Sequence, residues 1–517
     1  MAVSVTGLIL CSAILCGLIW IILYHVKRLR MYKAAAKYPG PVAWPFLGNA
    51  YYFIGKNEDI LNKIIKLMNT YPSPLRFWLG QRLFFAVYDA EEMKTVFLSP
   101  KTIEKEDLYK FARPWLGTGL FTAPASKWRV HRKLILPTFN QKILESFVEV
   151  FSAQSQIMVK NMEVEVDGEE FDIFNYISLC TLDIICETAM GVAVKAQTER
   201  NSRYVESAKR AFEVIFTRMF KIWLHPDIIF NHTQLGADQR TCVEYLHSLT
   251  NDVIQKKKQT FHPVNGKIAN SEVVENQPNQ RKAFLDLLME LSNNGTKFTD
   301  EELREEVDTM MIAGNDTTAT VNCFALLMMA NFPEIQDRVY QELYDIYGMD
   351  DPDDSPIKHE DLHRMEYLER VIKETLRLFP VGPILVRRVI DDLNIGTHTL
   401  PKGSSVVLGI FHVHRSEKYW PDPLKFDPDR FLPEEVAKRH PFAFTPFSAG
   451  PRNCLGLKYA MMAMKALLGT VLRRYIIKKD HMTPISEMKL KADVMLKPVE
   501  PIKFRIERRI PKIGCID

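Results

Sequence analysis

The segment that most constrains this chain is a run of ten residues at positions 447–456, Phe-Ser-Ala-Gly-Pro-Arg-Asn-Cys-Leu-Gly. A cysteine binds a metal as its thiolate, and the N-terminus of a helix stabilises that anion through free N–H groups and the helix dipole. The apolar spacing after Cys454 predicts such a helix to about residue 474. The flanking glycines permit a tight loop that a flat cofactor can approach, and Arg452 supplies a charge for an anionic cofactor edge. The segment predicts a metal-thiolate site, and the alternative is a structural cysteine buried in a Gly/Pro loop.

A second constraint is the apolar N-terminus, where no charged side chain occurs between Ala2 and Tyr24. At about 1.5 Å per residue this run spans the hydrocarbon core of a bilayer, which is roughly 30 Å thick. Basic residues follow between His25 and Lys37, so the positive-inside rule places the rest of the chain in the cytosol. The alternative is a cleaved signal peptide, which carries its basic segment first and has a shorter apolar core. We therefore expect an N-terminal transmembrane anchor over residues 1–25.

Composition excludes several classes of protein. The chain has 517 residues, of which 47% are hydrophobic and 25% charged, as in ordinary globular proteins. A net charge of +4 is too small to indicate nucleic acid as a partner. Eight cysteines in a chain of this length do not indicate a disulfide framework, so the globular part is expected to face a reducing compartment.

The hydrophobic periodicity predicts a mainly α fold with a small β portion (α+β). A β-hairpin is expected over 75–89, where two apolar stretches flank a Gly-Gln-Arg turn. A long helix is expected to begin after Thr299, with Glu302 completing a capping box. Another helix is expected over 360–379, because Pro380 stops it, and residues 384–411 are typical of short strands.

Three polar motifs interrupt these elements. Asp316 and Thr317 lie inside an apolar helix, where an aspartate is unfavourable unless it is hydrogen-bonded, and broken local rules often mark function. The alternative is a kinked helix with a satisfied polar cluster. Glu374 and Arg377 share one helix face at a spacing of three, as many solvated salt bridges do. Trp128 and Arg132 share a face at a spacing of four, and a core tryptophan beside a surface arginine is the alternative there.

Together these segments resemble the cytochrome P-450 family of haem-thiolate monooxygenases. Residues 447–456 match the pattern FxxGxRxCxG of that family at all five specified positions. The other motifs resemble its WxxxR, (A/G)Gx(D/E)T(T/S) and ExxR patterns. Two longer stretches, WLGTGLFTAPASKWRVHRKLILPTF and EEVDTMMIAGNDTTA, look most like family four and its arthropod relatives. The chain departs from the common pattern at Asp429, where most members have Glu.

The resemblance implies roles for individual residues. The haem-binding residues would be Trp128, Arg132, Arg387, Phe447, Arg452 and Cys454, with Cys454 as the axial ligand of the iron. The catalytic residues would be Asp316, which relays protons, and Thr317, which holds bound dioxygen. A buried structural triad would consist of Glu374, Arg377 and Arg430.

The resemblance also implies a function. One oxygen atom of O₂ would be inserted into a lipophilic substrate such as a fatty acid, terpenoid, odorant or xenobiotic. Electrons would come from NADPH through NADPH–cytochrome P-450 reductase, with cytochrome b5 as a further partner, and Lys127, Arg129, Lys133 and Lys458 would form the basic docking face. The chain would be a single-pass protein of the endoplasmic reticulum (microsomal) membrane. Its basic flank and Pro/Gly hinge would cover 26–50, and its cytosolic catalytic domain 51–510.

Two further expectations concern the cofactor and the rival functions. Several family-four members carry Glu directly before the Gly of the motif (A/G)Gx(D/E)T(T/S) and esterify haem through that Glu. This chain has Ala313 at the same position. Haem b is therefore expected to be held non-covalently. One rival function is a haem isomerase or peroxide-using enzyme, which the pair Asp316-Thr317 disfavours. The other is a haem protein that only sequesters its ligand, which steady NADPH consumption with product formation would exclude.

Overall fold

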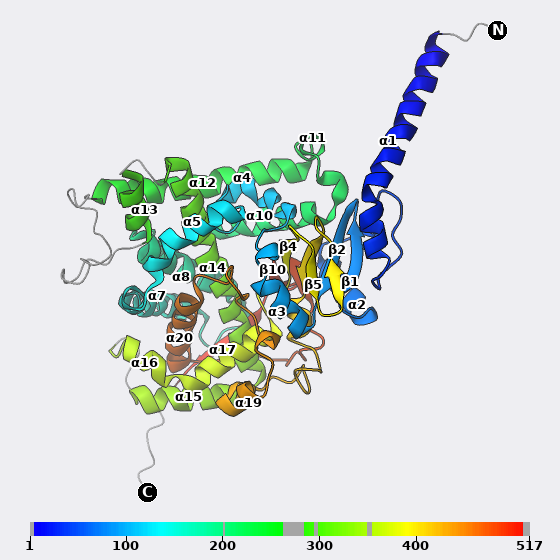
Figure 1. Ribbon diagram of the computed structural model, residues 1–517. Helices are drawn as coiled ribbons and strands as arrows, with labels where there is room; N and C mark the ends of the chain where they lie inside the picture. Colours follow the sequence, from blue (N-terminus) through cyan, green and yellow to red (C-terminus); the bar gives the residue numbers. More distant parts are fainter. Residues whose placement is uncertain (1–4, 200–201, 262–283, 294–297, 349–353, 510–517) are drawn as a thin grey trace.

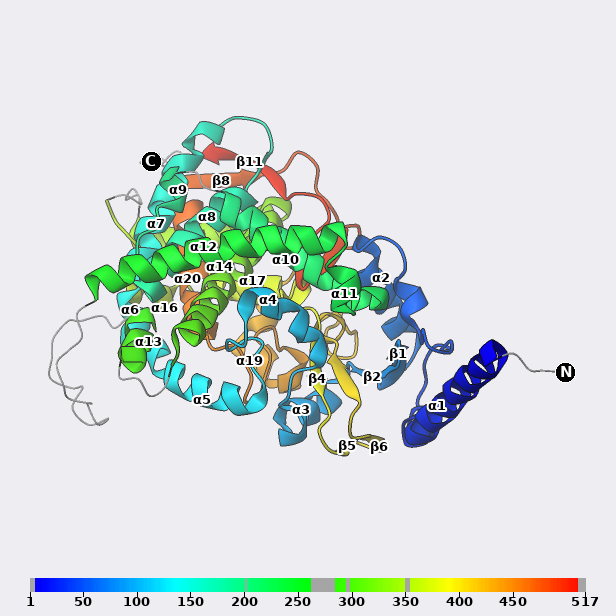
Figure 2. The same ribbon diagram turned by 90° about the horizontal axis from the view of Figure 1, so that it is seen from above.

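A helix of 32 residues, α14 (Asp300–Asn331), crosses the middle of the molecule (Figures 1 and 2). The computed structural model describes residues 5–199, 202–261, 284–293, 298–348 and 354–509. The predicted capping box at the start of α14 is present: Thr299 Oγ1 accepts from Glu302 N at 3.1 Å, and the Glu302 side chain accepts from Thr299 N. Almost every side chain from Val307 onward is buried, so α14 forms the centre of the hydrophobic core.

The neighbouring helices approach α14 closely. At Gly314 a Cβ atom would lie 2.5 Å from Ile185 in α8 (Phe174–Ile185), so only glycine permits this packing. The other helices of the described chain surround this pair: α2 (Glu58–Thr70), α3 (Ala90–Leu98), α4 (Arg113–Leu116), α5 (Ala125–Ile135), α6 (Gln141–Ser146), α7 (Val148–Asn161), α9 (Ala196–Glu199), α10 (Arg203–Phe220), α11 (Asp227–Phe230), α12 (Gln234–Thr260), α13 (Phe284–Asn293), α15 (Pro333–Tyr347), α16 (His359–Arg364), α17 (Glu366–Leu378), α18 (Ile410–Val413), α19 (Pro433–Ala437) and α20 (Leu457–Arg474).

The strands form small sheets beside the helices. The largest sheet has the order β1-β2-β7-β4, with β1 (Leu75–Leu79) and β2 (Arg82–Val87) as the predicted hairpin. The remaining strands are β3 (Phe171–Asp172), β4 (Leu385–Arg388), β5 (Leu393–Ile395), β6 (His398–Leu400), β7 (Ser405–Leu408), β8 (Tyr475–Lys478), β9 (Leu490–Asp493), β10 (Met495–Pro498) and β11 (Lys503–Arg508). The prediction of a mainly α fold with a small β portion is confirmed.

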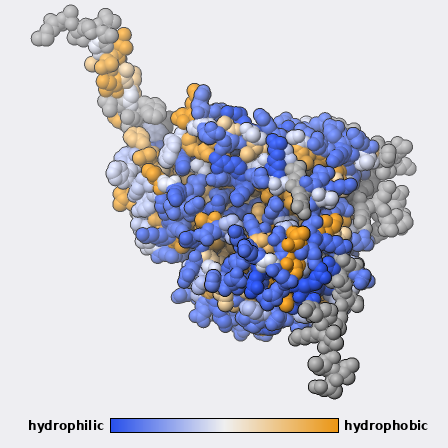
Figure 3. Space-filling model, turned by 180° about the vertical axis from the view of Figure 1, so that it is seen from behind, coloured by the Kyte–Doolittle hydropathy of each residue, from blue (hydrophilic) through white to orange (hydrophobic). Residues whose placement is uncertain are grey.

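The N-terminal helix α1 (Val5–Ala35) projects from the globule next to this sheet (Figure 1). Its segment Ile9–Val26 has a mean hydropathy of 2.3 and is not buried, so it is long enough and apolar enough to cross a membrane. Figure 3 shows apolar residues along the projecting part. The helix extends beyond the predicted anchor through the basic flank, and its end is built into the sheet: Ala35 and Tyr38 are buried in the core around β2.

Two other predicted helices can be compared with the structure. The helix expected over 360–379 is two helices, because the chain breaks at Met365 between α16 and α17. Its predicted stop is correct, since α17 ends at Leu378, just before Pro380. The helix expected after Cys454 is α20, which begins at Leu457 and ends at the predicted residue 474.

Candidate functional site

The loop before α20 presents Cys454. Its backbone N–H donates to Phe447 O at 2.9 Å, which closes the loop on itself. Gly450 has φ +70°, and a side chain there would collide with the backbone of Phe97, so this position requires glycine. The Cys454 side chain is accessible, although it lies among enough protein atoms for burial to raise its pKa. The N–H of Gly456 and the Arg132 guanidinium oppose that rise, because both favour the thiolate.

Three cations meet above this loop, and we call Lys105, Arg387 and Arg452 the cation cluster. The pKa of Lys105 lies well below its ordinary value because the group is buried beside the two guanidinium groups. Within the described part of the chain none of the three forms an ion pair, and Nε and Nη1 of Arg452 are buried without a hydrogen-bond partner. Buried charge without a counter-charge is unfavourable. The cluster therefore fits an anionic cofactor edge such as the two propionates of haem.

Helix α5 adds an aromatic ring and a fourth cation to the same region. The guanidinium of Arg452 lies 4.7 Å from the Trp128 ring centroid, and that of Arg132 lies 5.7 Å from it. Arg132 also donates to Asn453 O at 2.8 Å and to Asn453 Oδ1 at 2.6 Å, which ties α5 to the cysteine loop. The i, i+4 spacing read from the sequence thus brings both side chains to the cysteine loop.

The middle of α14 has one accessible strip in an otherwise buried stretch. Ala313 is exposed and Thr317 half-buried, whereas their neighbours Asn315 and Asp316 are buried. The Thr317 hydroxyl donates to Ala313 O at 2.6 Å, one turn earlier in the helix. An accessible hydroxyl on this strip can form hydrogen bonds to a small ligand.

Asp316 does not contact that hydroxyl. Lys497 on β10 donates to Asp316 Oδ1 at 2.7 Å and to Thr320 Oγ1 at 2.7 Å, and the other oxygen, Oδ2, is buried without a hydrogen-bond partner. One oxygen of the carboxylate is thus held by a cation, and the other has no hydrogen-bond partner within the described residues. Lys497 was missed from the sequence because 181 residues separate it from Asp316.

The three residues of the predicted triad lie together, with Glu374 and Arg377 fully buried and Arg430 half-buried. Arg377 Nε and Nη2 each donate to the Glu374 carboxylate at 2.7 Å, and both side chains are fully buried. Arg430 Nε lies 3.6 Å from Glu374 Oε1. Arg377 also donates to the carbonyl oxygens of His414 at 2.9 Å and Pro423 at 2.7 Å. The triad therefore fixes the backbone that leads into the cysteine loop.

One residue of the predicted docking face is placed differently. Lys127 donates to Thr118 Oγ1 at 2.7 Å and pairs with Glu302 at 3.0 Å and Glu305 at 3.3 Å, so it belongs to an interior network. Its part in the docking face stays a prediction, and the carboxylates of α14 already bind its ammonium group. The other three cations are exposed: Arg129, Lys133 and Lys458.

Comparison with known proteins agrees with this geometry. The sequence model of the family described as Cytochrome P450 matches residues 38–505. "Cytochrome P450 4c3" of Drosophila melanogaster is 38% identical over 501 residues, which cover 95% of this chain and 93% of that protein. "Cytochrome P450 4V2" of Homo sapiens is 38% identical over 470 residues, covering 90% and 89%. "Cytochrome P450 4g15" of Drosophila melanogaster is 34% identical over 552 residues, covering 95% of each. Relatives this similar over most of both chains, together with a cysteine loop that fits an iron-thiolate, establish that the chain belongs to the cytochrome P450 family and is a haem-dependent monooxygenase.

Proposed function

We propose that Cys454 is the axial ligand of haem b, and that the cation cluster, Trp128 and Arg132 bind its propionates. The observation that carries this proposal is a group of three buried or half-buried cations that form no ion pair within the described residues, next to a cysteine that the N-terminus of α20 follows. When bound, haem supplies the activation of dioxygen, which the electron-rich thiolate favours. Phe447, in the same loop, packs against the core beside this seat.

The distal residues handle hydrogen bonds and protons. Thr317 offers its hydroxyl on the accessible strip of α14, and Asp316 exchanges protons through its free oxygen while Lys497 holds the other. Haem is held non-covalently, because Ala313, on the same strip, has no carboxylate to form an ester. Acidified organic solvent is expected to extract all the haem, and haem that stays on the denatured chain would contradict this assignment.

The substrate is a lipophilic small molecule, such as a fatty acid, terpenoid, odorant or xenobiotic. A cavity of about 60 Å³ between α2, the large sheet and the end of α10 is lined by apolar side chains alone, among them Phe220, Ile384 and Val386. This cavity is smaller than a ligand pocket of about 300–1,000 Å³, so it supports only the apolar character of this region.

Electrons reach the site from NADPH through NADPH–cytochrome P-450 reductase, with cytochrome b5 as a second donor. Arg129, Lys133 and Lys458 are exposed around the cysteine side and suit an acidic partner. The chain crosses the endoplasmic reticulum membrane once through α1, with the domain over 51–510 in the cytosol, because basic residues follow the apolar span. Exposed apolar side chains near the foot of α1, Trp44 and Phe46, suit a membrane surface.

The test replaces the proposed iron ligand. Cys454→Ser should abolish the absorption band of the reduced carbon monoxide complex that gives the family its name, and steady NADPH consumption with a hydroxylated product should disappear with it. A Cys454→Ser protein that kept the band would contradict the ligand assignment. Wild-type protein that binds lipophilic ligands but never consumes NADPH with the reductase would favour a sequestering function instead.

A further inference from the structure

A fully buried carboxylate in the first half of α14 joins two elements that lead to the haem-binding residues. Glu306 has no exposed surface. Its Oε1 lies 2.6 Å from Nδ1 of His131 in α5, and its Oε2 accepts from the backbone N–H of Leu120 at 3.0 Å. A buried carboxylate needs such partners, because removing it from water without them is unfavourable. The bond to Leu120 and the bond to His131 are thus strongly favoured.

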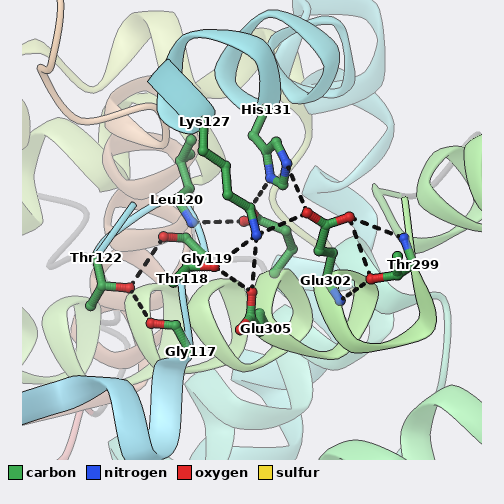
Figure 4. A network of polar contacts seen from close by, with 11 residues as sticks. Gly117, Thr118, Gly119, Leu120, Thr122, Lys127, His131, Thr299, Glu302 and Glu305 are labelled. Carbon is green, nitrogen blue, oxygen red and sulfur yellow. Dashed lines mark hydrogen bonds and ion pairs between the residues drawn. The ribbon is translucent and has the colours of Figure 1, made fainter. Parts of the chain in front are cut away.

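The loop that contains Leu120 lies directly on α14, and we call residues 117–123 the strap. At Gly119 a Cβ atom would lie 2.5 Å from Glu305 O, so glycine is what permits the contact. Thr118 Oγ1 donates to Glu305 Oε2 at 3.0 Å, and Lys127 from α5 donates to the same Thr118 hydroxyl (Figure 4). The strap, α5 and α14 are therefore held together by one network of carboxylates.

The strap reaches the cation cluster at two points. The Phe121 ring centroid lies 3.7 Å from Lys105 Nζ, and Ala123 O accepts from Arg452 Nη2 at 2.7 Å. The second route runs through α5, where His131 directly precedes Arg132 and follows Trp128 by one turn. Both routes from Glu306 end on residues of the proposed haem seat.

We propose that Glu306 is a positioning residue for haem, which acts through the strap and through His131 on the groups that bind the propionates. This inference rests on the proposed assignment of those groups to haem. In Glu306→Gln one carboxylate oxygen becomes an NH2 donor, so either the Leu120 N–H or the His131 ring loses its acceptor, and the common anchor of the strap and α5 on α14 is weakened. The expected consequence is faster loss of haem from a chain that stays folded. Mutation of residues that hydrogen-bond to the binding residues of a cofactor typically lowers its affinity by about 10- to 100-fold.

The experiment measures the rate at which the purified full-length holoenzyme transfers haem to excess apomyoglobin. Glu306→Gln removes the charge and keeps the shape, and haem release should be about tenfold faster than in the wild type. The matched control is Glu301→Gln, an exposed glutamate in the first turn of the same helix, which should release haem at the wild-type rate. Far-ultraviolet circular dichroism before transfer establishes that each variant is folded.

A second pair of variants addresses the partner. His131→Asn keeps an N–H donor near the position of Nδ1, so slow haem release should be retained, whereas His131→Leu should release haem as fast as Glu306→Gln. This pair also decides the question if Glu306→Gln does not fold. Equal release from His131→Asn, His131→Leu and the wild type would overturn the inference.

A reference variant separates this inference from the proposed haem seat. Arg452→Leu removes a cation that the seat is proposed to use directly. If Arg452→Leu releases haem rapidly while Glu306→Gln does not, the positioning role is wrong and the seat stands. If Arg452→Leu also retains haem, the assignment of the seat itself is wrong.

Discussion

Removing the guanidinium of Arg377 should leave the chain unable to fold stably. In Arg377→Met the Glu374 carboxylate remains fully buried and loses two charge-assisted hydrogen bonds of 2.7 Å. Removing one partner of a buried ion pair costs about 3–5 kcal/mol. The carbonyl oxygens of His414 and Pro423 lose their donor as well, at about 1 kcal/mol or more each. The sum is at least about 5 kcal/mol, which approaches the whole stability of about 5–15 kcal/mol of a typical domain.

The assay is thermal unfolding followed by circular dichroism, together with the amount of haem recovered per chain. The matched control is Lys438→Met, which breaks a pair with Glu435 at 2.7 Å whose side chains are 69% and 44% exposed, so the change should stay within about 1 kcal/mol. Burial raises the pKa of Glu374, and Arg377 opposes that rise. Any folded fraction of Arg377→Met should therefore increase as the pH falls and the Glu374 carboxyl, left with Arg430 and the Asp427 N–H as partners, takes up a proton. An Arg377→Met protein that binds haem fully and melts within a few degrees of the wild type would refute the reasoning.

The remaining predictions concern the distal side and the neighbourhood of α14. Thr317→Val should leave the fold and the bound haem intact, and NADPH oxidation should continue while hydrogen peroxide rises and product falls. Asp316→Asn should instead slow oxygen reduction itself. An unchanged ratio of product to NADPH in Thr317→Val would mean that Thr317 only shapes the helix. Lys497→Met should also lower this ratio, because it frees the Asp316 carboxylate from its cation, while Lys491→Met, which breaks a 2.8 Å pair with Asp493 in the same hairpin, should not. Burial raises the pKa of Asp308 to about 8. Above about pH 4 the folded state therefore keeps a proton on this carboxyl that the unfolded state releases. The Asp308 carboxyl should thus reduce stability progressively from about pH 4 to 8. Asp308→Asn should therefore flatten the decline of the melting temperature over that range, and an identical slope in both proteins would exclude this carboxyl as its source.

The sequence predicted correctly those elements that depend on residues close together in the chain. The capping box at Thr299, the hairpin over 75–89 and the helix stop before Pro380 each depend on residues within a few positions of one another. The same holds for Trp128 and Arg132, which one helix turn brings together. Contacts of this kind follow from the period of the element and need no knowledge of the tertiary fold.

The contacts that could not be predicted join segments far apart in the chain. The backbone of Lys105 forms an isolated β-bridge with that of Arg387, and no periodic signal in the sequence marks this half-buried lysine as a neighbour of two arginines. Lys127 was expected only as part of the basic docking face, and its carboxylate partners were not predicted. Its true environment depends on Glu302 and Glu305, which approach only when α5 packs across the start of α14. Such placement requires the fold itself.

The continuity of α1 with the globule has a mechanical consequence. Arg28 hydrogen-bonds to Gln81 in the β1–β2 turn, Arg30 pairs with Asp392 at 2.6 Å, and the helix ends at Ala35 inside the sheet core. Side-chain contacts, and not the chain alone, thus join the membrane span to the enzyme. A helix adjusts its tilt to the thickness of the bilayer. In a thinner bilayer α1 would tilt further from the membrane normal, and the catalytic domain would rotate with it. The lipid composition would then set the angle between the enzyme and the membrane surface in which its substrates are dissolved.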